Sequence, residues 1–203
     1  MKINRLAVRL CMCALVLFRA LSLYADGKDS LSRKMIHMAG IDVKPAYIFP
    51  THEFFAGNNA TFSPIRKNLS VHLKYGFKFA PDTYFGRMYP HAVQGIGVGY
   101  NTFFHSSELG TPWSVYAFQT SRIASLTPRL SLDYEWNFGA SFGWKKYDAE
   151  SNPYNRVVGS RINAYIHLGF LLNWQLDAQT NLRAGIGVTH FSNGNTAYPN
   201  AGV

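Results

Sequence analysis

The residues best placed for chemistry are His190 and Ser192, near the end of the segment LRAGIGVTHFSNGNTAYPN, residues 182–200. Apolar residues stand at every second position before them, which is the period of a β-strand, and His190 and Ser192 continue the apolar side. At a rise of about 3.3 Å per residue their Cβ atoms are about 7 Å apart, within hydrogen-bonding reach of the two side chains. A base beside a hydroxyl is the pair that nucleophilic catalysis requires, so we interpret them as catalytic candidates.

The same alternation recurs along the chain and predicts the elements that position this pair. Counting strong and weak segments, we expect seven strands, at residues 38–49, 68–79, 93–104, 111–119, 127–145, 160–174 and 180–192. One side of these segments is apolar with large aromatics, and the other is mainly glycine, serine and charged residues. A soluble sandwich also alternates, but long strands with aromatics near their ends are typical of a transmembrane β-barrel. The expected fold class is therefore an all-β, antiparallel transmembrane β-barrel of the eight-stranded type.

The N-terminus predicts export. Cations at positions 2, 5 and 9 precede an apolar run over residues 10–18 and small residues up to Ala25, which is the pattern of a signal peptide over residues 1–25. A transmembrane helix is the alternative, but the run is short and Arg19 interrupts it. Both cysteines, Cys11 and Cys13, fall inside this segment. The remaining domain, residues 26–203, would therefore have no disulfide and no thiolate chemistry.

The composition is consistent with a barrel in a membrane. The chain is 47% hydrophobic and only 15% charged, which suits an exterior that faces something other than water. Removing the four cations of residues 1–25 lowers the formal net charge from +9 to +5 (9 − 4). A basic exported protein without a cluster of lysine and arginine indicates an anionic surface as partner more than nucleic acid.

The strand count gives a further expectation. Seven strands is an odd number, whereas bacterial single-chain barrels have even numbers from eight upward. We therefore expect residues 26–203 to be an incomplete barrel that lacks its last strand. With a periplasmic N-terminus, the last predicted strand ends near the outer-leaflet headgroups, and the connections over residues 51–67 and 146–159 lie on the same side. Residues 80–92 then form a periplasmic turn that is long for such a turn.

The residues HFSNG followed by YPNAG, after a strand of small and apolar residues, resemble the signature of the lipid A 3-O-deacylase family, outer-membrane barrels often described as acyloxyacyl hydrolases. The resemblance implies a His, Ser and Glu triad on the lipid-facing surface, with His190 as general base and Ser192 as nucleophile. It also implies an oxyanion role for Asn200 and motif positions for Asn193 and Gly194 beside the nucleophile. The family glutamate would fall beyond Val203.

The implied activity is hydrolysis of an ester-linked acyl chain of lipid A, in lipopolysaccharide of the outer leaflet, without a cofactor. A fragment that lacks the glutamate could be inactive. Formation of a homodimer is also possible. The alternative is a non-catalytic structural or binding barrel of the outer membrane, a pseudoenzyme. In that case His190 and Ser192 are polar groups of the barrel rim, and Asn193-Gly194 and Pro199-Asn200 are turn residues.

Other polar residues carry weaker hypotheses. The cations Lys145, Lys146 and Arg156 are candidates for binding the lipid A phosphates, or else form a solvated loop. Inward-facing acidic residues, at positions 133 and 135, are expected to pair with arginines such as those at positions 161 and 183. His52-Glu53 lacks the second histidine of a zinc helix, so no metal is implied. The sequence contains no phosphate-binding loop, no dinucleotide fingerprint and no internal repeat.

Overall fold

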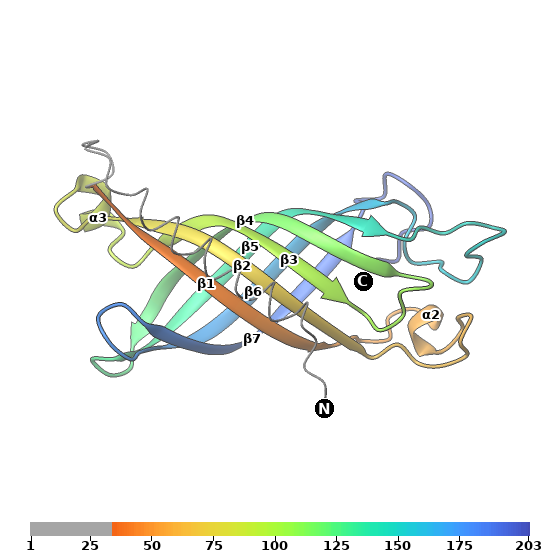
Figure 1. Cartoon of the computed structure of the whole chain (residues 1–203), viewed down its shortest axis with the longest axis horizontal. Coiled ribbons are helices and arrows are strands. Elements are labelled where there is room, and N and C mark those ends of the chain that lie inside the picture. Colours follow the sequence, from red (N-terminus) through yellow and green to blue (C-terminus); the bar gives the residue numbers. More distant parts are fainter. Residues whose placement is uncertain (1–33) are drawn as a thin grey trace, which may run out of the picture.

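The computed structural model describes residues 34–203; the expected signal peptide and its two cysteines lie outside the described residues. One seven-stranded antiparallel sheet, with its strands in sequence order, curls into a half-barrel (Figure 1). This confirms the all-β fold class. The strands are β1 (Met35–Tyr47), β2 (Lys67–Phe79), β3 (Val93–Thr102), β4 (Gly110–Ser125), β5 (Leu130–Trp144), β6 (Ile162–Gln175) and β7 (Asn181–Ser192).

The two faces of the sheet have the composition that the alternation predicts. Ile186 on the convex side is 81% exposed, whereas Glu135 on the concave side is 2% exposed. Leu132 and Trp136 share the convex side with Phe170 and Ile186 because they pair with residues of the same face across the ladders. Asp133, Glu135, Asn163 and Arg183 lie on the concave side, where three of them are buried and Arg183 is half-buried. The predicted division into one apolar face and one polar face is confirmed.

Charged residues on the concave side form a cluster that we call the interior ion cluster. It consists of Asp42 and Lys44 of β1, Lys74 of β2, Glu135 of β5 and Arg183 of β7. Lys74 lies between the two carboxylates, 2.5 Å from Asp42 Oδ2 and 2.5 Å from Glu135 Oε1. Arg183 reaches Asp42 at 3.3 Å and therefore links the last strand to the first. The expected role of Arg161 is wrong: it is exposed and forms none of the ion pairs of the described residues.

The sheet is open between its first and last strands. Within residues 34–203, β1 pairs only with β2 and β7 pairs only with β6, so each has one edge without a neighbouring strand.

The apolar core lies at one end of the half-barrel, where β5, β6 and β7 meet the loops. Phe191 packs against Trp144 and Tyr165, with ring centroids 5.0 and 5.4 Å apart. Loop residues close over this group: Phe54, Phe55, Ile65, Leu109, Val157 and Val158. We call the whole set the outer-loop core. Buried Glu108 ties the loops together, because its carboxylate accepts from Ala60 N at 2.9 Å and its carbonyl accepts from Asn155 Nδ2 at 2.8 Å.

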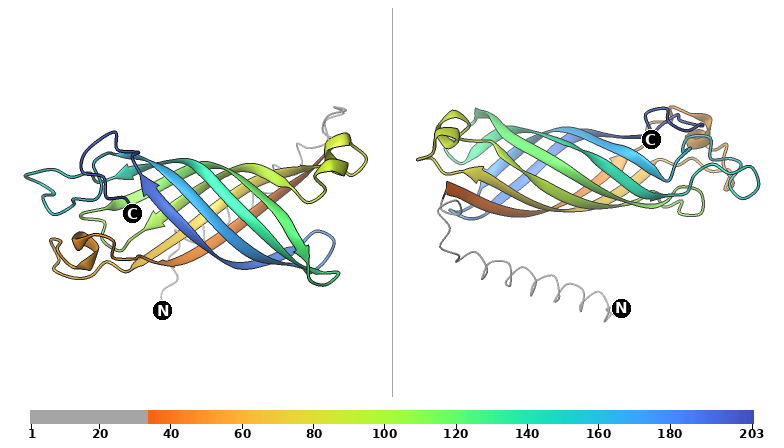
Figure 2. Two further views of the ribbon diagram at one scale, coloured as in Figure 1. Left: turned by 180° about the vertical axis from the view of Figure 1, so that it is seen from behind. Right: turned by 90° about the horizontal axis from the view of Figure 1, so that it is seen from above.

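Two connections contain short helices that the alternation does not predict. Helix α2 (Glu53–Ala56) lies in the connection between β1 and β2, where His52 caps it by accepting from Phe54 N at 3.1 Å. Helix α3 (Tyr84–Met88) occupies the long turn between β2 and β3, at the opposite end of the molecule (Figure 2). Neither helix of the described residues has the length and hydropathy of a membrane-spanning helix.

The strand bounds differ most in β4, which continues to Ser125 beyond the predicted end at residue 119. The extra residues pair with the start of β5 across a register shift between Arg122 and Ala124. A polar run and a bulge interrupt the period of two there, so the pattern hides the end of the strand.

Candidate active site

Strand β7 places His190 and Ser192 on the convex, lipid-facing side. His190 pairs with Ile166 of β6 and Ser192 pairs with Ala164, and Ile166 is itself 37% exposed on that side. The His190 side chain is exposed and Ser192 is half-buried. The period of two along the strand therefore holds up to its last residue, and the pair shares the face of Val188, which is 71% exposed.

The residue between them fixes the end of the strand. Phe191 points inward and is 5% exposed within the outer-loop core. Its backbone also pairs with the returning chain, since Phe191 N donates to Val203 O at 2.8 Å and Val203 N donates to Phe191 O at 3.0 Å. Phe191 thus anchors both neighbours, while their side chains remain on the other face.

The segment after β7 folds back against the pair. Gly202 has a φ of +74°, and a Cβ there would lie 2.6 Å from His190 Cε1. Glycine therefore lets the returning chain approach the imidazole this closely without displacing the ring. Asn200 forms an isolated β-bridge with Val158, which joins the returning segment to the connection between β5 and β6.

Polar groups of the returning segment gather at Ser192. Its Oγ donates to Asn200 Oδ1 at 3.3 Å and accepts from Gly194 N at 3.1 Å. Asn193 N also donates to Asn200 Oδ1, at 3.3 Å. The structure therefore brings Asn193, Gly194 and Asn200 together around the serine. Among the described residues it shows no hydrogen bond between Ser192 and His190, because the serine hydroxyl is turned toward Asn200.

Asn193 builds the turn that follows the serine. Its Nδ2 donates to Ala197 O at 2.7 Å, and its carbonyl accepts from Thr196 Oγ1 at 2.7 Å. Gly194 supplies the left-handed conformation with a φ of +63°, in open space. Asn193 and Gly194 therefore form a turn and also belong to the candidate site, because this turn directs the Gly194 N–H at the serine oxygen.

The candidate phosphate-binding cations lie at the same end but apart from the pair. Lys145, Lys146 and Arg156 are exposed in the connection between β5 and β6, and Lys145 Nζ donates to Ser107 O at 3.1 Å. No hydrogen bond of the described residues joins them to His190 or Ser192. In the same loop, hydrogen bonds from the backbone and hydroxyl of Ser151 lower the pKa of Asp148, which keeps an anion close to Lys146.

Two residues that shape the site, Phe191 and Gly202, do not belong to the catalytic candidates that the sequence indicates. The strand pattern does place Phe191 on the inward side, but its partner Trp144 comes from β5, which does not pair with β7. The role of Gly202 depends on a fold-back that no local signal predicts. Within residues 34–203 no group of three or more His, Cys, Asp or Glu side chains is arranged to hold a metal ion.

Comparison with known proteins gives one match. The model of a family described as lipid A 3-O-deacylase (PagL) matches residues 95–203, more than half of the chain. The matched region contains β4 to β7, most of β3, and every candidate site residue. No curated protein and no solved structure matched the chain.

Proposed function

Because the chain belongs to the lipid A 3-O-deacylase (PagL) family, we propose that Ser192 and His190 carry out its deacylation of lipid A in the outer membrane. The observation that carries this proposal is the lipid-facing position of both side chains, with the Gly194 amide and the Asn200 side chain within 3.3 Å of the serine oxygen. Placing polar side chains on a lipid-facing strand costs free energy. A role in cleaving an ester in the outer leaflet explains why this pair lies there.

The reaction is nucleophilic ester hydrolysis in two steps. Ser192 Oγ attacks the carbonyl carbon of the acyl ester while a ring nitrogen of His190 takes the hydroxyl proton. The tetrahedral intermediate then expels the sugar hydroxyl, which leaves with the proton from His190. Water attacks the resulting acyl-serine, His190 again accepts and returns a proton, and a free fatty acid is released.

The first step needs a rotation of the serine side chain. In the resting arrangement Oγ donates to Asn200, and turning about χ1 redirects it toward His190. Catalytic hydrogen bonds are often long or misaligned without substrate. The rotation also leaves the Gly194 N–H available as a donor for the developing oxyanion, a contact typically worth about 3–4 kcal/mol. Asn200 presents its acceptor Oδ1 to the serine, so it becomes a second donor only when its side-chain amide turns over and directs Nδ2 to the oxyanion.

The open edge of β7 indicates where the third member of the triad belongs. A strand paired there would place a side chain opposite His190 at about 5 Å. We assign to that position the acidic residue that fixes the imidazole tautomer, on the strand that closes the barrel. In the same proposal, residues 1–25 direct export and residues 26–203 form the incomplete barrel that this strand closes.

Substrate reaches this site laterally, because lipid A itself occupies the outer leaflet. Lys146 and Arg156 lie in the connection between β5 and β6. A β-bridge between Val158 and Asn200 joins this connection to the returning segment. These cations are therefore the best placed candidates for the lipid A phosphates, although Asp148 offsets part of their charge.

The test is mass spectrometry of lipid A from cells that express the full-length protein, including the strand that closes the barrel, or its variants. Ser192→Ala and His190→Asn should each abolish the loss of one acyl chain, and the double variant should lose no more than either single one, because the residues act as a unit. Ser106→Ala, an exposed serine at the same end of the molecule, is the matched control. Unaltered lipid A with the unchanged protein would favour the non-catalytic barrel, and a fully active Ser192→Ala would remove the nucleophile assignment.

A further inference from the structure

The connection between β2 and β3, residues 80–92, is a built surface at the end of the molecule opposite the candidate site. Thr83 caps α3 by accepting from Gly86 N at 3.0 Å and donates to Ala80 O at 2.7 Å. A Cβ on Gly86 would lie 1.9 Å from Ala80 O, so the helix packs directly onto the end of β2. Arg87 Nη1 adds a bond to Asp82 O at 2.7 Å. The helix is therefore held in one orientation.

This orientation displays apolar side chains. Tyr84, Phe85, Met88 and Tyr89 are each more than half exposed. They continue the convex face of β2, because the Phe85 ring lies 5.3 Å from the Phe79 ring. The lipid-facing surface of the barrel thus extends past the strand end onto α3.

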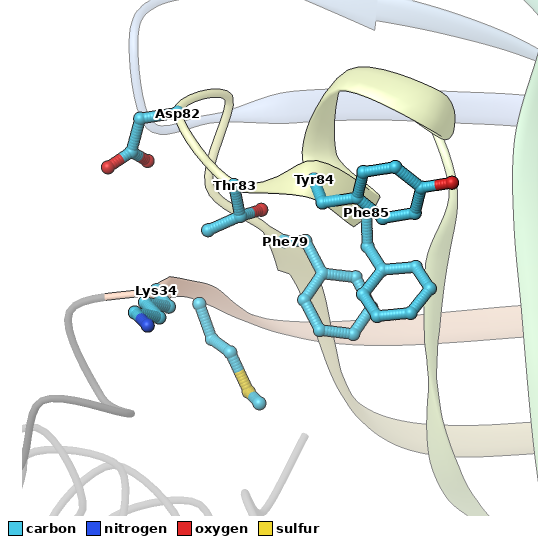
Figure 3. Close-up of a pocket in the computed structure, with 7 residues that line it drawn as sticks. Lys34, Phe79, Asp82, Thr83, Tyr84 and Phe85 are labelled. Atoms are coloured by element: carbon cyan, nitrogen blue, oxygen red, sulfur yellow. The ribbon is translucent and has the colours of Figure 1, made fainter.

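A groove of about 340 Å³ opens between α3 and the first residues of β1. Its lining consists of Lys34, Met35, Phe79, Asp82, Thr83, Tyr84 and Phe85. Figure 3 shows the aromatic rings of Phe79 and Phe85 side by side, with Lys34 and Asp82 away from them. The groove therefore has an apolar wall and a polar mouth.

The charged side chains of the groove are one cation and one anion, Lys34 and Asp82, and both are exposed. Arg87 of α3 is also exposed and lies close by, since it donates to the backbone carbonyl of Asp82. An apolar wall with Lys34 and Arg87 beside it fits a molecule that has an acyl chain and an anionic head.

We propose that the groove holds an anionic glycerophospholipid of the leaflet opposite the catalytic pair, with its acyl chain against Phe79 and Phe85 and its phosphate at Lys34. The assignment of the leaflet rests on the proposed function, which places His190 and Ser192 in the outer leaflet. Aromatic side chains at headgroup level and cations that attract anionic lipid are the usual interfacial anchors of membrane proteins. Continuity with the lipid-facing surface of β2 favours a lipid over a protein partner.

The experiment uses the full-length protein, including the strand that closes the barrel, folded into vesicles of equal phosphatidylcholine and phosphatidylglycerol and extracted in mild detergent, with co-purified phospholipid measured by mass spectrometry. The unchanged protein should retain phosphatidylglycerol in preference to phosphatidylcholine. Lys34→Gln should reduce this preference about fivefold, the factor that corresponds to the roughly 1 kcal/mol of one cation near an anionic surface. Tyr84→Ser with Phe85→Ser should reduce retention of both lipids.

The matched control is Lys67→Gln with Phe62→Ser, an exposed cation and an exposed aromatic at the other end, and it should retain the preference. No preference in the unchanged protein, whether the groove stays empty or takes a protein partner, overturns the proposal. So does a Lys34→Gln variant that keeps the full preference, and this exposed substitution leaves the fold intact. Deacylation is measured on the same samples after lipid A is added. Its absence with the preference intact removes only the proposed function, and its presence without the preference removes only the lipid site.

Discussion

At the scale of single residues, the site depends on how closely the returning chain approaches the imidazole. His190 is exposed on the lipid-facing side of the sheet. On its other side, the imidazole ring lies close to Gly202. Two features favour glycine there. Its φ is +74°, and a Cβ would lie 2.6 Å from His190 Cε1 and push the ring aside. The position of the base is therefore set by a residue that itself carries no chemistry.

We expect Gly202→Ala to displace the His190 ring and lower kcat at least tenfold while the barrel stays folded. A misplacement of about 1 Å is enough to cost about a hundredfold in rate. The measurement is the rate of acyl release from lipid A in detergent, with circular dichroism as the check of folding.

Gly57→Ala is the matched control, because Gly57 also has a positive φ, +124°, but a Cβ there has its nearest neighbour at 3.7 Å. That variant should keep its activity. Equal losses in both variants would mean that backbone strain at this end of the molecule, and not the contact with His190, causes the effect.

At this scale the sequence predicts the face of each residue but not its partners. The period of two is local, so it places Val188, His190 and Ser192 on one side and Phe191 on the other, as observed. The bond from Ser192 to Asn200 depends on how residues 193–203 fold back, which no periodicity encodes. The sequence therefore indicates a serine–histidine pair, whereas the resting structure has a serine–asparagine bond.

At the scale of elements, β7 separates two surfaces that a substrate could use. Val188 stands on the lipid side next to His190, whereas Thr189 points to the interior and hydrogen-bonds to His167 Nδ1 at 2.8 Å. Gly187 on the interior side has no room for a larger side chain, since a Cβ would lie 2.7 Å from Leu168 O. Thr189 is therefore the better interior position to vary.

Val188→Trp should slow deacylation about tenfold or more by blocking the lateral approach of lipid A, whereas Thr189→Leu should change the rate little. The comparison needs initial rates of acyl release and a folding assay for both variants. If Val188→Trp were fully active while a folded Thr189→Leu had lost activity, the substrate would enter through the interior, and the lipid-facing site would have to be given up.

The elements also mark where the strand pattern stops being informative. All seven strands are predictable because each has a lipid-facing side, and lipid demands a continuous apolar surface. The last residues of β4 are not, since the bulge after Arg122 breaks the alternation. Helices α2 and α3, of four and five residues, are too short for a helical period and depend on caps such as Thr83.

At the scale of the whole molecule, side chains link the first and last strands where backbones do not. Arg183 of β7 bonds to Asp42 of β1 at 3.3 Å, and Lys74 connects Asp42 to Glu135. The interior ion cluster thus holds β1, β2, β5 and β7 at a common register. Such ion pairs orient the strands, but within residues 34–203 no strand pairs with the N–H and C=O groups along the seam.

These unpaired groups give the last prediction. Each exposed backbone group in hydrocarbon costs several kcal/mol, and for that reason β-structure spans membranes only as closed barrels. A polypeptide that ends at Val203 should therefore run at the same position on a gel heated and unheated, because the open sheet does not resist detergent. The same polypeptide extended by a strand that pairs with β1 and β7 should show a faster, heat-sensitive band. A heat-sensitive band from the polypeptide without that strand would mean that β1 and β7 can meet directly, with Arg183 and Asp42 drawing the two edges together.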